Sequence, residues 1–104
     1  MRRYVVERSF AYGWQNGAEF CHGAVERNAD EGVTWLHSYV SDDTRRMFCV
    51  YEAPSPEAIR KTAKRNGLPI DRITEVRVLD PYFYGGGRGV NVAEPITGSK
   101  GETS

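Results

Sequence analysis

Long hydrophobic runs are missing from this 104-residue chain. A membrane-spanning helix needs about 18 or more consecutive apolar residues, so we expect no membrane partner. A surplus of one charge is missing as well, because 14 Lys and Arg side chains balance 14 Asp and Glu side chains. This balance argues against a protein that binds nucleic acid through bulk electrostatics. No repeat recurs along the chain, and its length suits a single domain.

Cysteine and histidine are scarce. Cys21 and Cys49 are too few for a disulfide framework, so we expect two core thiols in a cytoplasmic protein. The first residues hold too short an apolar core for a secretion signal. The two histidines, His22 and His37, form no HxxxH pair, and no CxxC motif occurs. The sequence therefore lacks the strong signatures of a metal site.

What is present is an alternation of strand-like and helix-like segments. Segments 3–10, 33–40, 47–53 and 70–79 are rich in β-prone residues and predict four strands. Asn16 with Glu19 resembles a capping box and predicts the start of a first helix, which Gly32 ends. Ser55 before Pro56 predicts the start of a second helix, and Asn66-Gly67 predicts its end.

The order βαββαβ predicts an α+β fold of the ferredoxin-like type: a four-stranded antiparallel sheet with two helices on one face. From residue 85 onward a glycine cluster and a polar run cannot bury a core. We therefore expect one domain over residues 1–84 and a flexible C-terminal tail over residues 85–104. The other face of the sheet is expected to be bare.

The register of the hairpin decides which side chains lie on that bare face. If Val40 faces Met47, His37 lies opposite Val50 and Trp35 lies opposite Glu52. The bare face then carries Trp35, His37, Tyr39, Phe48, Val50 and Glu52, while Cys49 and Tyr51 face the helices. A slip of one residue would move Cys49 and Tyr51 to the face of His37. The loop does not settle this choice, and the first register is preferred.

Either register leaves large aromatic side chains on an uncovered face. A small monomer rarely tolerates such a patch in water, so we expect a homodimer with two sheets packed face to face. The alternative is that the tail or a loop covers the face.

Three segments carry a resemblance to a known family: TWLHSYVS (34–41), FCVYEAPSPEAIR (48–60) and NGLPIDRITEVRVLDPY (66–82). They resemble the small nickel-binding, nickel-responsive proteins of actinobacteria. The match runs over about residues 3–84 and is weaker at 12–20. The resemblance implies a ferredoxin-like fold, a dimer and a nickel ion. Some relatives carry a histidine in the second helix where this chain has Thr62.

Residues on three strands are candidate metal ligands. Glu7, His37 and Glu52 lie on the first, second and third predicted strands, where opposed side chains are about 5 Å apart at Cβ. Imidazole with two carboxylates suits a borderline divalent ion such as nickel. The alternative is an ordinary buried histidine bonded to a glutamate. His22 is expected to face solvent, as a weak further ligand.

The sequence thus predicts a small dimeric metal-binding protein with a preference for nickel, acting in buffering or storage, without catalytic residues. A second hypothesis is a small-molecule binder or cofactor-free enzyme of the dimeric α+β barrel type. An aromatic pocket would then be lined by Trp35, Tyr39, Phe48, Cys49 and Tyr51, with His37 as acid or base. A third hypothesis is a module that only dimerises.

Overall fold

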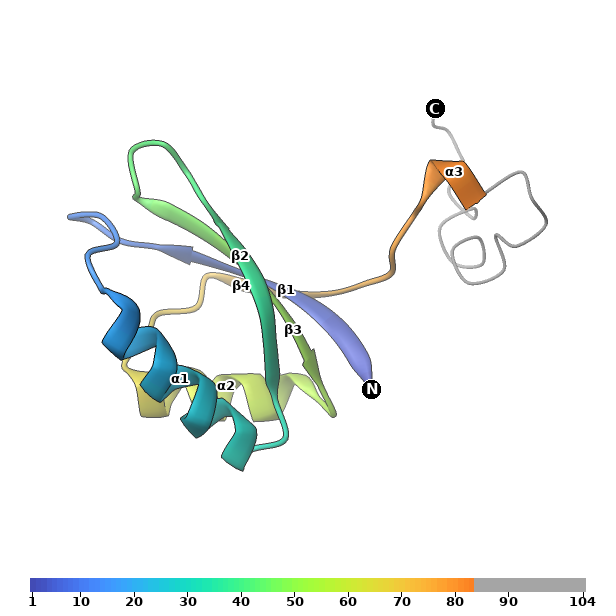
Figure 1. Cartoon of the computed structure of the whole chain (residues 1–104), viewed down its shortest axis with the longest axis horizontal. Coiled ribbons are helices and arrows are strands. Elements are labelled where there is room, and N and C mark those ends of the chain that lie inside the picture. Colours follow the sequence, from blue (N-terminus) through green and yellow to red (C-terminus); the bar gives the residue numbers. More distant parts are fainter. Residues whose placement is uncertain (84–104) are drawn as a thin grey trace.

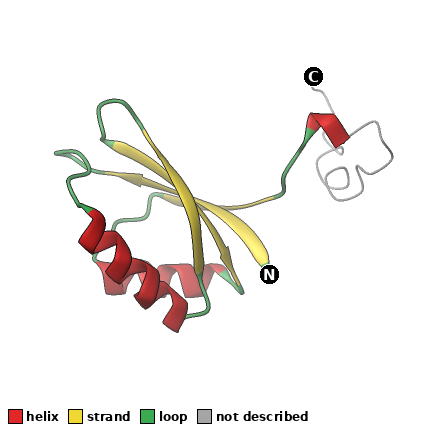
Figure 2. Ribbon diagram, viewed as in Figure 1, coloured by secondary structure: helices red, strands yellow, loops and turns green. Residues whose placement is uncertain are grey.

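Four strands form one antiparallel sheet, and two helices pack on one of its faces (Figures 1 and 2). The structure is a computed structural model, and residues 1–83 are described. The elements are β1 (Arg2–Ser9), α1 (Ala18–Asp30), β2 (Thr34–Val40), β3 (Arg46–Ala53), α2 (Pro56–Asn66), β4 (Arg72–Val76) and the short α3 (Pro81–Phe83). The predicted α+β, ferredoxin-like fold is confirmed. The predicted tail, 85–104, lies outside the described residues.

The strands follow the order β2-β3-β1-β4, so β1 and β3 are central and β2 and β4 are the edges. β1 pairs with β3 on one side and with β4 on the other, although these strands are far apart in the sequence. Because α1 and α2 cover the same side (Figure 1), no described helix covers the opposite side, which we call the open face.

The ends of α2 follow the predicted signals. The Ser55 side chain accepts a hydrogen bond from the Ala58 amide, and Pro56 stands in the first turn. Gly67 ends the helix in the left-handed conformation, with φ of 69°. The prediction for α1 was wrong at its start: the cap is Gly17, without any side-chain hydrogen bond, rather than Asn16. Gly17 adopts the extended conformation of a cap residue, and the Asn16 side chain is not the cap.

The hairpin register is confirmed at one end and corrected at the other. Val40 lies opposite Met47, and His37 lies opposite Val50. A bulge then intervenes at Leu36, so Trp35 lies opposite Tyr51 and not opposite Glu52. An extra residue in one strand reverses the face of everything beyond it. Trp35 therefore faces the helices, where its indole Nε1 donates to Ser38 Oγ at 2.8 Å.

The core lies between the sheet and the two helices. Its fully buried members come from β1, β3 and α2 together with the residue before β2: Tyr4, Val6, Met47, Cys49, Tyr51, Ala53, Ile59 and Val33. Cys49 is a buried free thiol and Cys21 a half-buried one, as expected from the sequence. The prediction that Cys49 and Tyr51 face the helices is confirmed.

Arg8 is the exception in this apolar layer. It follows Tyr4 and Val6 on the inward side of β1 and is only 1% exposed. Its guanidinium donates to the Tyr51 hydroxyl at 2.9 Å and to the Pro69 carbonyl at 2.7 Å. The Nε has no partner within the described residues. A cation this deeply buried depends on each of its few acceptors.

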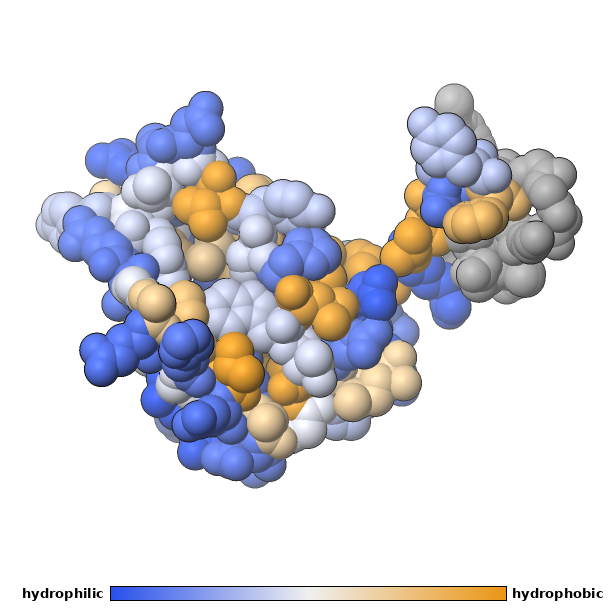
Figure 3. All heavy atoms as spheres, in the orientation of Figure 1, coloured by the Kyte–Doolittle hydropathy of each residue, from blue (hydrophilic) through white to orange (hydrophobic). Residues whose placement is uncertain are grey.

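β4 is shorter than expected, since it ends at Val76 rather than at residue 79. The chain then leaves the sheet and runs to α3, away from the body of the domain (Figure 1). Val78 and Leu79 are about half exposed on this segment, where hydrophobic atoms are visible in Figure 3.

Candidate functional site

The open face consists of parallel rows of side chains that run across the four strands. One row joins Tyr39, Phe48, Glu7 and Arg72; the next joins His37, Val50, Val5 and Thr74; the third joins Thr34, Glu52, Arg3 and Val76. His37, Glu7 and Glu52, the predicted metal ligands, all lie on this face.

The middle of the open face is apolar. Val50 is only 9% exposed, and Val5 and Phe48 are half-buried. Tyr39 is 62% exposed, and its ring meets the His37 ring edge-to-face with centroids 5.2 Å apart. His37 is itself exposed. An imidazole thus stands in solvent beside an exposed aromatic ring and a partly buried aliphatic strip.

The two carboxylates already have cationic partners. Glu52 accepts from Arg3 at 2.7 Å, and Glu7 pairs with Arg46 at 3.3 Å. The Arg46 guanidinium also lies 5.1 Å from the centre of the Phe48 ring. These pairs were not predicted from the sequence. The available signal was that each strand with a glutamate also carries arginine: Arg3 lies on the strand of Glu7, and Arg46 on the strand of Glu52.

The three predicted ligands occupy three different rows, so one chain does not bring them together. Glu52 lies on the strand next to His37 and one row away, about 7–8 Å diagonally. Glu7 lies two strands from His37, or about 10 Å across the sheet. Glu7 and Glu52 are separated along their strands by four residues, about 13 Å. Accordingly, residues 1–83 contain no group of three or more His, Cys, Asp or Glu side chains that could hold a metal ion.

His22 and Thr62 lie away from the open face. His22 is exposed on α1, in agreement with the prediction that it faces solvent. Thr62 is buried on α2, and its hydroxyl donates to the Ile59 carbonyl at 2.8 Å. Because the sheet separates α2 from His37, a ligand at position 62 and His37 of the same chain would belong to different sites.

The five residues of the predicted aromatic pocket are divided by the sheet. Tyr39 and Phe48 lie on the open face, while Trp35, Cys49 and Tyr51 lie on the helix side. The Trp35 and Tyr51 rings are 6.3 Å apart and pack within the core. A single pocket lined by all five does not form in one chain.

Burial raises the pKa of the Tyr51 phenol to about 12, and the neighbouring Arg8 guanidinium only partly offsets this effect. The phenol is therefore neutral at physiological pH. It acts as the hydrogen-bond acceptor of Arg8 and belongs to the packing of the core rather than to an acid or base exposed on the open face.

Residues 4–76 match the model of a family described as nickel responsive protein SCO4226-like. The chain belongs to this family. The matched residues include all four strands apart from the first two residues of β1, and both main helices. The family name indicates a nickel-related role and agrees with the resemblance found in the sequence.

The fold is also similar to a solved structure, the crystal structure of SCO4226 from Streptomyces coelicolor A3(2). The TM-score is 0.58 at 22% sequence identity, over 73% of this chain and 96% of that chain. Such a likeness supports the fold alone. No curated protein matches the chain. Within the described residues, no helix has the length and apolar content needed to cross a bilayer.

Proposed function

We propose that the chain binds nickel as a homodimer in which the open faces of two copies pack together. The observation that carries this proposal is the exposed His37 beside an apolar strip on a face that neither main helix covers. Membership of a nickel-responsive family supports the choice of ion. A buffering or storage role suits a chain in which the described face offers ligands rather than a catalytic constellation.

A second copy would supply what one chain lacks. A symmetric interface uses the same surface on both subunits, so two imidazoles and four carboxylates would enter it. Glu52 is the carboxylate nearest to His37 in its own chain and would have to leave Arg3 to bind an ion. Glu7 of the same chain is too far from His37 to bind the same ion. The Glu7 that joins His37 would therefore come from the second copy.

The ligand chemistry fits nickel better than magnesium or calcium. Imidazole is a borderline donor that nickel accepts readily, whereas magnesium and calcium prefer oxygen. His37 would therefore determine the preference for nickel. Glu7 and Glu52 would add charge, so their replacement should weaken binding with less change in selectivity.

The aromatic-pocket alternative gains no support from the geometry. Three of its five residues face the helices, and Tyr39 and Phe48 alone remain on the open face. The same two side chains serve equally well in a dimer interface.

The dimer is tested by Tyr39→Glu, with Tyr12→Glu as the matched control. Tyr39 is 62% exposed, so one chain should tolerate the charge, whereas a desolvated interface should not. Tyr12 is 90% exposed and lies in the loop between β1 and α1. Light scattering should report a dimer for the parent and for Tyr12→Glu, and a monomer for Tyr39→Glu. A monomeric parent at micromolar concentration would contradict the proposal.

A further inference from the structure

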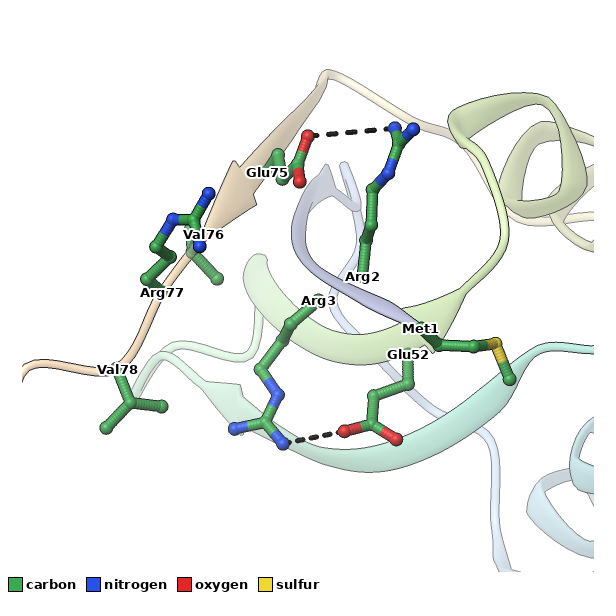
Figure 4. A pocket seen from close by; sticks show the side chains of 8 residues that line it. All are labelled: Met1, Arg2, Arg3, Glu52, Glu75, Val76, Arg77 and Val78. Carbon is green, nitrogen blue, oxygen red and sulfur yellow. Dashed lines mark hydrogen bonds and ion pairs between the residues drawn. The ribbon is translucent and has the colours of Figure 1, made fainter. Parts of the chain in front are cut away.

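A hollow of about 490 Å³ opens at the end of the sheet where β1 begins and β4 ends (Figure 4). It is lined by residues 1–3, by Glu52 and by residues 75–78. The volume is within the range of small-molecule sites. The hollow lies beside the third row of the open face. Arg3, Glu52 and Val76 are the residues that belong both to that row and to the lining of the hollow.

The strand register explains why the hollow exists. The β1–β4 ladder ends at the pair Arg3–Val76. One further step in the same register would place Arg77 directly opposite Arg2. Like charges on opposed positions destabilise a strand pair, and the chain separates from β1 at this point. The position where two guanidinium groups would repel each other is thus the position where β1 and β4 separate and the hollow opens.

The charges that line the hollow are unequal. Three arginines face two glutamates. Arg3 is closely paired with Glu52 at 2.7 Å, whereas Arg2 and Glu75 are 3.9 Å apart. Arg77 has no ion pair or hydrogen bond to any residue that the structure describes. In Figure 4 the Arg2 side chain is directed toward Glu75, and Arg77 stands on the other side of the β4 end. The hollow therefore retains one unpaired guanidinium and one loosely paired one.

We propose that this hollow binds a small organic polyanion, whose carboxylate or phosphate groups pair with Arg77 and with Arg2. Guanidinium groups bind both kinds of oxyanion in a two-pronged geometry. The size of the hollow exceeds that of a single inorganic ion, and Val76 and Val78 offer apolar contact to a carbon skeleton. No aromatic ring lines the hollow, so nothing in it selects a nucleobase by stacking.

The test is calorimetric titration of the metal-free full chain with citrate and, separately, with fructose 1,6-bisphosphate. Three variants are compared with the parent. Arg77→Gln should weaken binding about tenfold or more, since it removes a charged hydrogen-bond donor. Arg60→Gln is the matched control: Arg60 is exposed on α2 and pairs with Glu57 at 3.2 Å, so its loss should leave affinity within about twofold. Glu75→Gln should tighten binding, because Arg2 loses its competing carboxylate.

The outcomes separate the possibilities. Tighter binding of citrate identifies a carboxylate site, and tighter binding of the bisphosphate identifies a phosphate site. Equal weakening by Arg77→Gln and Arg60→Gln would overturn the proposal in favour of general attraction to positive charge. A parent that shows no saturable binding of either probe would overturn it as well. Nickel affinity, measured without these anions, should be the same in Arg77→Gln and the parent, so either proposal can fail without the other.

Discussion

Replacing Tyr51 by phenylalanine should destabilise the fold more than the loss of a single oxygen atom suggests. The change removes only a hydroxyl, but that hydroxyl accepts from Arg8 at 2.9 Å in a fully buried setting. Arg8 already has an unpartnered Nε and then loses one of its two oxygen acceptors, keeping the Pro69 carbonyl. Leaving a second nitrogen of a buried guanidinium without an acceptor costs about 2–3 kcal/mol.

Tyr4→Phe is the matched control. Tyr4 is equally buried on β1, and its hydroxyl accepts from Arg2 at 3.3 Å. The Arg2 side chain is 57% exposed, so water can replace the lost acceptor, and the cost should stay below about 1 kcal/mol. Urea unfolding followed by circular dichroism at one protein concentration compares the two variants. Equal losses of unfolding free energy would refute the assigned role of Arg8.

The same pair predicts the dependence of stability on pH. The pKa of Tyr51 is raised by burial to about 12 in the folded protein, against about 10 when unfolded. The folded state therefore keeps a proton that the unfolded state releases, and stability is lost as the pH rises from about 10 to 12. The loss amounts to about 2–3 kcal/mol. Tyr51→Phe should show a flatter profile over this range, and an unchanged profile would contradict the assignment.

Two further predictions concern the helix ends. Gly67→Ala should cost about 1 kcal/mol although an added Cβ meets nothing within 4 Å there, because Gly67 has a φ of 69°; an unchanged thermal midpoint would contradict this reading. Ser55→Ala should lower the unfolding free energy by about 1 kcal/mol through loss of the cap on the Ala58 amide, and an unchanged urea midpoint would show that the cap contributes nothing.

Local signals in the sequence were sufficient for much of the fold. Ser55 and Gly67 bound α2 as predicted, because capping depends on residues within one helical turn. The alternation of β-prone residues predicted all four strands. The polar loop did not decide the hairpin register. The register with Val40 opposite Met47 was preferred because it placed a mostly apolar set against the helices, and this pairing sets the faces of His37, Cys49 and Tyr51.

Features that depend on distant residues could not be predicted. The bulge at Leu36 places Trp35 on the helix side. The sequence prediction missed this because it assumed a strict two-residue period, which an inserted residue breaks. β4 ends at Val76, where one further step would place Arg77 opposite Arg2, and that pairing is set only by the sheet.

The burial of Arg8 was missed for a similar reason. Its acceptors, Tyr51 and Pro69, are 43 and 61 residues away along the chain. The one signal in the sequence was a charged residue at an inward position, two residues after Val6. The arrangement of the candidate metal ligands could not be predicted for the same reason. His37, Glu7 and Glu52 share a face as expected, but long-range strand pairing places them in separate rows.

The most direct test of the proposed function is titration of nickel into untagged protein, in the parent, His37→Ala and His22→Ala. Both histidines are exposed, but His22 is on α1 and His37 is on the open face. We predict saturable nickel binding by the parent and by His22→Ala, and the loss of most binding in His37→Ala with the dimer retained. Equal nickel affinity in the parent and in His37→Ala would contradict the central claim that His37 is the nitrogen ligand.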